Sequence, residues 1–371
     1  MNRFHACVGA FIWLVSAGAA VAAADDPDGL YAEVATTRGL IILRLEFEKA
    51  PMTCANFVGL AEGTIANAAF PPGVPFFDGT VWHRVVPGHV IQCGIPKEGK
   101  SEGPGYAFPN EIVAGLGHGR AGMVNMANGG PHTNGSQWCI TLGDRSYLDG
   151  DYTVFGEVLR GMDVVFSIIQ GDIVKSVKIV RVGQAALRFR PTSESFREMV
   201  DEAWSRVRNA EARKKNDEEG IISRSWPRAM EAGRGVRFLI LKEGQGAVPE
   251  NGSRVRVAYS GKTLHGKTFI STGDGGKPCS GDRPEPFDAV VGRPLVNPAL
   301  DETIGRMKKG ERRLVIVPAD QAYGKSGFYA PERKGEKRFV ISPDTVLVYE
   351  VTLLEILPPG SLPPAATRSL P

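Results

Sequence analysis

Cysteine is scarce in this sequence, and its spacing argues against a metal site. The 371 residues include 5 cysteines. No two of them form a Cys-x-x-Cys pair, and no cluster of cysteines and histidines has the spacing of zinc ligands. We therefore predict that the protein binds no metal.

An excess of charge of either sign is also missing. Lys and Arg number 44 against 41 Asp and Glu, which gives a formal net charge of +3. No basic stripe with interleaved aromatic residues stands out along the chain. The sequence therefore argues against nucleic acid as a partner.

Long hydrophobic runs are absent except at the N-terminus. There Arg3 precedes an apolar stretch at 6–15 and a small-residue region at 20–24, which is the pattern of a secretory signal peptide. A retained membrane anchor is the alternative, but the segment becomes small and polar before reaching the roughly twenty apolar residues of a membrane span. We predict cleavage of residues 1–24 and an exported protein without a membrane span. The compartment would be the periplasm for a Gram-negative source, or the outside of the cell otherwise.

Removal of Cys7 with the signal leaves an even number of cysteines (5 − 1 = 4), namely Cys54, Cys93, Cys139 and Cys279. An oxidising compartment favours disulfides in such a set. Side chains alternate along a strand, however, so Cys139 shares a face with Gln137, and Cys93 lies opposite to Gln92. If both glutamines face one groove, Cys93 and Cys139 point apart. We therefore prefer four free thiols.

The length allows two or three domains, and 42% hydrophobic residues suffice for packed cores. Residues 28–185 show the short alternating runs of a mainly β domain, with helices predicted at 54–62 and 162–169. A second mainly β domain is predicted at 234–358. The Pro-rich residues 359–371 are predicted to be disordered.

Residues 186–233 differ in character from both β domains. Apolar residues recur at intervals of three and four from Phe196 to Val207 among charged residues, which predicts an amphipathic helix with Ser193 as its N-cap. A charged run follows at 212–220. We interpret the segment as a helical linker packed on one domain; a binding helix is the alternative.

Two sequence blocks carry the strongest functional signal. The first is VWHRVVPG at 81–88, and the second begins MANGGPHTNGSQ and occupies 126–156. In order and spacing they resemble the two walls of the proline-binding groove in the cyclophilin family of peptidyl-prolyl isomerases. The resemblance implies a closed β-barrel capped by two helices.

Isomerisation of an Xaa-Pro bond requires neither a nucleophile nor a cofactor. Rotation breaks amide resonance over a barrier of roughly 20 kcal/mol, so a catalyst must hold the proline and stabilise the twisted amide. Arg84 suits this task because its guanidinium presents several rigid N–H groups and stays charged. It matches the family's catalytic arginine, and Gln92 is assigned with it. The resemblance places these further residues in the groove: His89, Val90, Ala127, Asn128, Gly129, Gln137, Cys139, Tyr147, Leu148 and Tyr152.

From Gly235 to about Leu357 the chain resembles the FKBP family, a second class of prolyl isomerases. That family binds proline between a curled antiparallel sheet and a short helix, so the resemblance implies an α+β domain. The residues matching its pocket are Tyr259, Phe269, Phe287, Val296, Leu300, Tyr323, Ile341 and Tyr349. Ordinary core packing is the alternative interpretation of these side chains.

Both sites depart from their family patterns. His89, Cys139 and Tyr147 stand where cyclophilins have large aromatic residues, and burying such a side chain is worth about 1.5–3 kcal/mol. We therefore predict that the first domain binds proline weakly and is a slow or high-KM isomerase with poor cyclosporin affinity, rather than an inactive one. In the second domain Ile270 replaces an acidic residue and Leu300 a tryptophan, which argues against efficient catalysis there.

The sequence thus predicts a mainly β protein with α-helices, in which a cyclophilin-like barrel is joined by a helical linker to an FKBP-like domain. We predict a peptidyl-prolyl cis-trans isomerase that assists folding of proline-containing unfolded or extended polypeptides, with catalysis mainly in the first domain. The alternative is a non-catalytic polypeptide-binding chaperone or scaffold that retains both folds. Activity in the second domain alone is a third reading.

Overall fold

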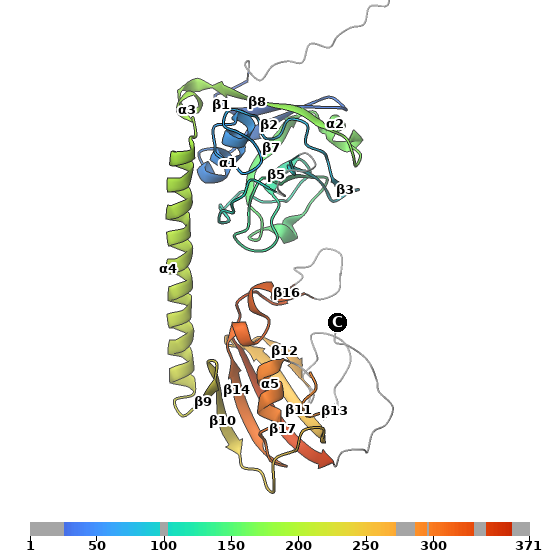
Figure 1. The fold of residues 1–371 in the computed structure, drawn as a ribbon, viewed down its shortest axis with the longest axis vertical. Helices are drawn as coiled ribbons and strands as arrows, with labels where there is room; N and C mark the ends of the chain where they lie inside the picture. The colour runs from blue at the N-terminus through green and yellow to red at the C-terminus, as the bar shows by residue number, and fades with distance from the viewer. Residues whose placement is uncertain (1–25, 97–102, 272–285, 295–296, 330–338, 358–371) are drawn as a thin grey trace, which may run out of the picture.

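The computed structural model describes residues 26–96, 103–271, 286–294, 297–329 and 339–357 (Figure 1). The predicted signal peptide, Cys279, Val296 and the predicted Pro-rich tail lie outside the described residues. Within the described ranges, no helix combines the length and the apolar character needed to cross a membrane.

The first domain is built on one eight-stranded sheet. Its strands lie in the order β3-β4-β6-β5-β7-β2-β1-β8. Their bounds are β1 Gly29–Thr36, β2 Leu40–Leu45, β3 Arg84–Val86, β4 Val90–Cys93, β5 Met123–Met126, β6 Trp138–Thr141, β7 Val154–Arg160 and β8 Val174–Val182. The bridge between Val81 and Ile173 joins the two edges of the sheet, and the Trp82 N–H donates to the Asp172 carbonyl at 2.9 Å. The curled sheet therefore confirms the predicted mainly β fold.

Two short helices flank this sheet. Helix α1, Pro51–Glu62, begins three residues before the predicted start, because proline suits the first turn and the Glu111 carboxylate accepts the N–H groups of Met52 and Thr53. It ends at Gly63, whose φ of 70° is the left-handed conformation that glycine adopts readily. Helix α2, Met162–Ser167, ends two residues before the predicted end.

The core of the first domain contains a cluster of buried aromatic rings. Phe57 of α1 stacks on Phe77 and lies edge-on to Trp138, which in turn contacts Trp82. All four side chains are at most 1% exposed. Trp82 lies two residues before β3 and Trp138 is the first residue of β6, so this packing fixes the positions of both strands.

A short helix, α3 Gly183–Arg188, leads into the 33-residue helix α4, Ser193–Ser225. The N-cap is Thr192 and not Ser193 as predicted. The Thr192 hydroxyl accepts from the Ser195 N–H at 3.2 Å and the Ser195 hydroxyl accepts from the Thr192 N–H at 3.0 Å, a reciprocal capping box.

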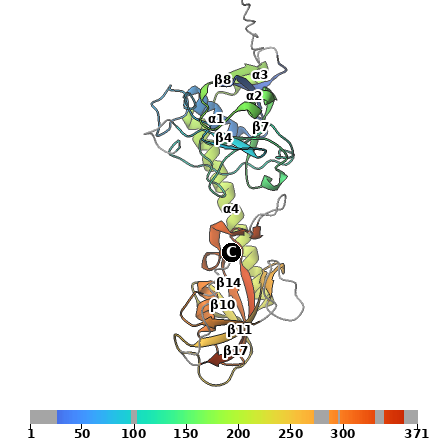
Figure 2. The same cartoon turned by 90° about the vertical axis from the view of Figure 1, so that its right-hand side faces the viewer.

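Helix α4 packs on both domains, which corrects the prediction that the linker packs on one. Phe196 is 5% exposed in the core of the first domain, and Ile222 is 8% exposed in a cluster with Leu314 and Val348 of the second. In both views α4 runs from one domain to the other (Figures 1 and 2). Because α4 is a single helix held at both ends, it sets the spacing of the domains.

The second domain contains a larger antiparallel sheet and a two-stranded ribbon. The path of the larger sheet is β12-β11-β17-β14-β10-β9, with β13 paired to β11. The bounds are β9 Met230–Gly233, β10 Val236–Lys242, β11 Arg254–Thr263, β12 Thr268–Ser271, β13 Phe287–Val290, β14 Arg312–Val317, β15 Phe328–Tyr329, β16 Phe339–Ile341 and β17 Leu347–Leu357, with helix α5 at Pro298–Ile304. Strand β9 falls within the predicted linker but pairs with β10, so it belongs to this sheet.

Three cysteines lie among the described residues, and all are buried and free. Gln92 of β4 pairs with Cys139 of β6, whereas Cys93 pairs with Trp138. Directly paired residues share a face of the sheet. Cys93 and Cys139 therefore lie on opposite faces, as predicted, and the preference for free thiols is confirmed for these two and for Cys54.

Candidate active site

A chain of hydrogen bonds joins the two predicted walls of the groove. Arg84 of β3 and Gln92 of β4 are directly paired across antiparallel strands. The Arg84 Nη1 donates to Gln92 Oε1 at 3.4 Å, and Gln92 Nε2 donates to Gln137 Oε1 at 2.8 Å. Arg84 is exposed, so its other N–H groups face solvent where a substrate would lie. The predicted catalytic pair is thus in contact.

The second wall comes from the loop before β6. The Ala127 N–H donates to the Gln137 carbonyl at 2.9 Å, and Asn128 Nδ2 donates to the Asp151 carbonyl at 3.0 Å. A hollow of about 380 Å³ lies beside them, and it is lined by Gln92, Gly103, Pro104, Tyr106, Ala127, Asn128, Gly129, Thr133, Gly135, Ser136 and Gln137. Five of the predicted residues therefore meet at one hollow.

Several lining residues were missed from sequence. Thr133, Gly135 and Ser136 lie inside the MANGGPHTNGSQ block, so the motif itself carried that signal. Tyr106 lies outside both blocks; its hydroxyl donates to Asn56 Oδ1 at 2.8 Å, and burial raises its pKa well above the usual range. Only the fold brings Tyr106 to this wall.

The altered proline wall is held by polar contacts. Arg145 Nε donates to His89 Nδ1 at 3.1 Å, and the Tyr147 hydroxyl lies 3.3 Å from His89 Nε2. Because Nδ1 accepts a hydrogen bond, the neutral ring carries its proton on Nε2 and donates it to Tyr147. Arg145 was not predicted, since an arginine in a loop gives no sequence signal for such a contact. Both ring nitrogens of His89 are thus engaged in contacts within the protein, with Arg145 and with Tyr147.

Four further predicted positions belong to the strands and the loop of this wall. Val90 is 3% exposed and Cys139 5% exposed, and strand alternation and pairing put both on the face of Gln92. Burial raises the pKa of Cys139 to about 12, against the opposing effect of the Arg84 charge, so the thiol is neutral at ordinary pH. Leu148 ends the short 3₁₀ helix Ser146–Leu148, and the Tyr152 N–H donates to its carbonyl at 3.3 Å.

His83 lies beside Arg84 in the sequence but is not suited to act as a base. Burial is the main cause that lowers its pKa, although hydrogen bonds with Val81 and Gln137 oppose this. Among the described residues its Nδ1 has no hydrogen-bond partner. The ring is therefore neutral near neutral pH.

In the second domain most predicted pocket residues are core residues. Tyr259, Phe269, Leu300, Ile341 and Tyr349 are 0–6% exposed and share one hydrophobic cluster, against which Tyr323 packs. Phe287 contributes backbone pairing with Val257, and its side chain is not described. These positions are brought together, but largely as packed interior.

Asn297 helps to explain this packing. Its Oδ1 accepts from the Leu300 N–H at 3.0 Å as the N-cap of α5, and its Nδ2 donates to the Tyr349 hydroxyl at 3.1 Å. The Phe269 ring lies edge-on to Tyr349, 5.8 Å between centroids. The Tyr349 oxygen thus accepts a hydrogen bond within the domain, and its side chain is fully buried.

Comparison with known proteins agrees with this geometry. Residues 31–184 match the family described as cyclophilin type peptidyl-prolyl cis-trans isomerase/CLD, and residues 246–354 match FKBP-type peptidyl-prolyl cis-trans isomerase. Peptidyl-prolyl cis-trans isomerase A of Mycobacterium tuberculosis H37Rv is 46% identical over 128 residues, covering 33% of this chain and 70% of that protein. Isomerase B of Streptomyces anulatus is 43% identical over 133 residues, covering 35% and 76%.

The chain belongs to the cyclophilin family. It is a peptidyl-prolyl cis-trans isomerase with a cyclophilin-type domain at 31–184 and an FKBP-type domain at 246–354. A crystal structure of a cyclophilin type isomerase from Cryptosporidium parvum aligns with a TM-score of 0.37 at 25% identity, covering 42% of this chain and 100% of that one. The substrates of such domains are proline-containing polypeptides.

The site of the cyclophilin-type domain can stabilise a twisted amide. Rotation about the Xaa-Pro bond breaks resonance and localises the lone pair on the proline nitrogen. Donors fixed near that bond stabilise the twisted state more than the planar one, which lowers the barrier. The contacts from Gln92 to Arg84 and to Gln137 hold the guanidinium in place before substrate arrives. No proton has to move.

The buried His118 predicts a pH-dependent stability. Its side chain is 0% exposed, and burial lowers its pKa even though Nδ1 lies 2.8 Å from Asp149 Oδ1. The unfolded chain, with a histidine pKa of about 6.5, therefore binds more protons than the native state below that pH. The contribution of His118 to the free energy of unfolding should be constant above about pH 6.5. It should decrease as the pH falls toward the pKa of the native state.

Urea denaturation at pH 7.5 and 5.5 measures this fall, and His118→Gln should make it smaller. The pKa values of His83 and His132 are also lowered by burial, so the substitution removes only part of the dependence. An equal decrease of the free energy of unfolding in wild type and variant would show that His118 does not contribute to the pH dependence.

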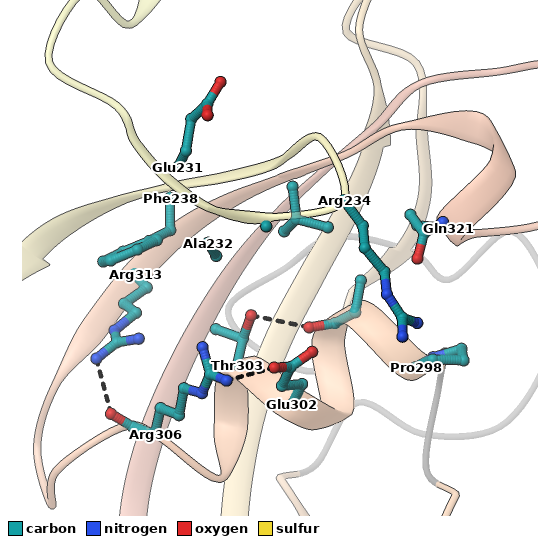
Figure 3. Close-up of a pocket in the computed structure, with 13 residues that line it drawn as sticks. Glu231, Ala232, Arg234, Phe238, Pro298, Glu302, Thr303, Arg306, Arg313 and Gln321 are labelled. Atoms are coloured by element: carbon teal, nitrogen blue, oxygen red, sulfur yellow. Dashed lines mark hydrogen bonds and ion pairs between the residues drawn. The ribbon is translucent and has the colours of Figure 1, made fainter.

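A further hollow, of about 570 Å³, lies on the FKBP-type domain between the β9–β10 hairpin and α5, and none of the predicted pocket residues lines it. Figure 3 shows Arg234 reaching across it toward Pro298. Of the two other lining arginines, Arg306 is paired with Glu302 and Arg313 with Glu311. Most of the positive charge around this hollow is therefore already neutralised within the domain.

Proposed function

We propose that the protein is an exported folding catalyst in which the cyclophilin-type domain carries the turnover and the FKBP-type domain holds extended, proline-containing chain. This division of labour is supported above all by the two hydrogen bonds that join Arg84 to Gln92 and Gln92 to Gln137. In the FKBP-type domain, by contrast, Tyr349 is buried and bound by Asn297.

The proposed export is supported by the N-terminal sequence, with its positive residue, apolar stretch and small-residue region. The mass of the chain purified from its natural source tests cleavage: loss of about 24 residues is expected. A mass that includes the first residues would contradict it.

The division of labour is tested by disabling each site in the full chain and following cis/trans relaxation of an Xaa-Pro peptide. Gln92→Ala frees the Arg84 side chain and should lower kcat/KM about tenfold, the effect of one lost charge-assisted hydrogen bond. Tyr323→Ala, which opens the edge of the FKBP-type cluster, should change kcat/KM less than about twofold. A larger loss of kcat/KM in Tyr323→Ala than in Gln92→Ala would place the main catalytic activity in the FKBP-type domain.

A further inference from the structure

Helix α4 touches the substrate-binding loop of the cyclophilin-type domain. The indole of Trp204, on α4, lies 6.0 Å between ring centroids from the imidazole of His132. About two turns before it, Phe196 packs on Tyr106 and Phe108, and the neighbouring residue Ala203 packs on the same core. The position of Trp204 is therefore fixed by the packing of the helix on which it lies.

His132 has an unusual backbone conformation. It is one of three described residues other than glycine with positive φ, at 61°, which is a strained region for a residue with a side chain. Asn110 holds it from both sides: the Asn110 N–H donates to His132 Nδ1 at 3.2 Å, and the His132 N–H donates to Asn110 Oδ1 at 3.3 Å. The surrounding contacts thus fix the conformation of this loop.

The same asparagine connects His132 to a groove residue. Asn110 Nδ2 donates to the Asp151 carbonyl at 2.9 Å, and Asn128 Nδ2 donates to that same carbonyl at 3.0 Å. Asn110 Oδ1 also accepts from Asn134 Nδ2 at 2.9 Å, and Asn134 is fully buried. A continuous set of contacts therefore leads from Trp204 through His132, Asn110 and the Asp151 carbonyl to Asn128.

We propose that Trp204 and His132 are positioning residues for the isomerase reaction, by which α4 fixes Asn128 in the substrate groove. The proposal rests on the proposed catalytic role of the cyclophilin-type domain. The linker helix then has two tasks, because the element that spaces the two domains also completes the groove of one of them. The cyclophilin-type domain reaches its full substrate affinity only with α4 docked.

The test is steady-state isomerisation by the full chain carrying Trp204→Ala. Asn128 lines the groove and does not act on the twisted bond, so its displacement should weaken ground state and transition state alike. We expect KM to rise about 3- to 10-fold, the effect of one lost aromatic contact, with kcat within about twofold of wild type. Trp204→Phe keeps a ring against His132 and should restore most of the affinity.

Trp226→Ala is the matched control, because Trp226 ends the same helix but packs on the other domain. Its KM should equal that of wild type. His132→Asn keeps a residue type that tolerates positive φ but removes the imidazole. It should raise KM as Trp204→Ala does, and the double variant should raise it no further.

An unchanged KM in Trp204→Ala, an equal rise in Trp226→Ala, or additive effects of the Trp204 and His132 changes would overturn the proposal. If Trp204→Ala does not fold, His132→Asn supplies the expected rise in KM, and Trp204→Phe remains the variant expected to keep most of the affinity. Failure of the catalytic assignment is distinguishable, because Gln92→Ala would then leave kcat/KM at the wild-type value.

Discussion

Replacing Arg84 by alanine in the full chain is expected to lower kcat/KM for an Xaa-Pro peptide by about 10²-fold or more, the cost of removing a preorganised donor to developing charge. The guanidinium is exposed and lies 3.4 Å from the side-chain oxygen of Gln92, which itself lines the hollow. Its N–H groups act on the twisted amide more than on the planar one, so the loss should appear in kcat. Protease-coupled or NMR exchange measurements of cis/trans relaxation report it directly.

Arg84→Lys is the informative control, because it keeps the charge but not the rigid fork of donors. We expect it to recover less than a tenth of the lost rate. Thermal unfolding should be unchanged in both variants, since the side chain is exposed. Wild-type turnover in Arg84→Ala would contradict the role assigned to the guanidinium.

Restoring an aromatic wall is expected to improve substrate binding. Cys139 stands where the cyclophilin pattern has phenylalanine, shares the face of Gln92 and is 5% exposed. Burying a large apolar side chain against proline is worth about 1.5–3 kcal/mol, so Cys139→Phe should lower KM about tenfold. Because Arg84 is untouched, kcat should stay within about twofold.

Cys139→Ser separates apolar area from simple loss of the thiol, and it should leave KM unchanged or raise it. An unchanged KM in Cys139→Phe, with the variant folded, would show that the wall formed by His89 and Tyr147 already closes the proline site. A fall in thermal stability of the phenylalanine variant would show that the strand has no room for the ring.

The extent of α4 shows where sequence patterns lose information. Apolar periodicity marked the helix only from Phe196 to Val207, because the next residues are charged on every side and present no apolar face. The helix continues because Ala, Arg, Lys and Glu favour helix, and because Ile222 finds a second apolar surface on the FKBP-type domain. That surface belongs to strands far along the chain, so no local pattern could reveal it.

The aromatic residues of the FKBP-type domain show a different limit. A tyrosine in a strand has the same local sequence signature whether it lines a pocket or fills a core. Asn297 decided the matter for Tyr349, since its amide reaches the phenol from the cap of α5. Such a contact depends on the crossing of helix and sheet, which the sequence does not encode locally.

The sequence by itself determined the two domains and the mainly β fold with helices, and it singled out Arg84 and Gln92, which the structure places in contact. It could do so because strand alternation and groove motifs are local patterns. Only the tertiary structure decided that Trp204 meets His132, that Tyr106 reaches the groove, and that α4 joins both domains. These are contacts between side chains distant in sequence, and packing of whole elements selects them.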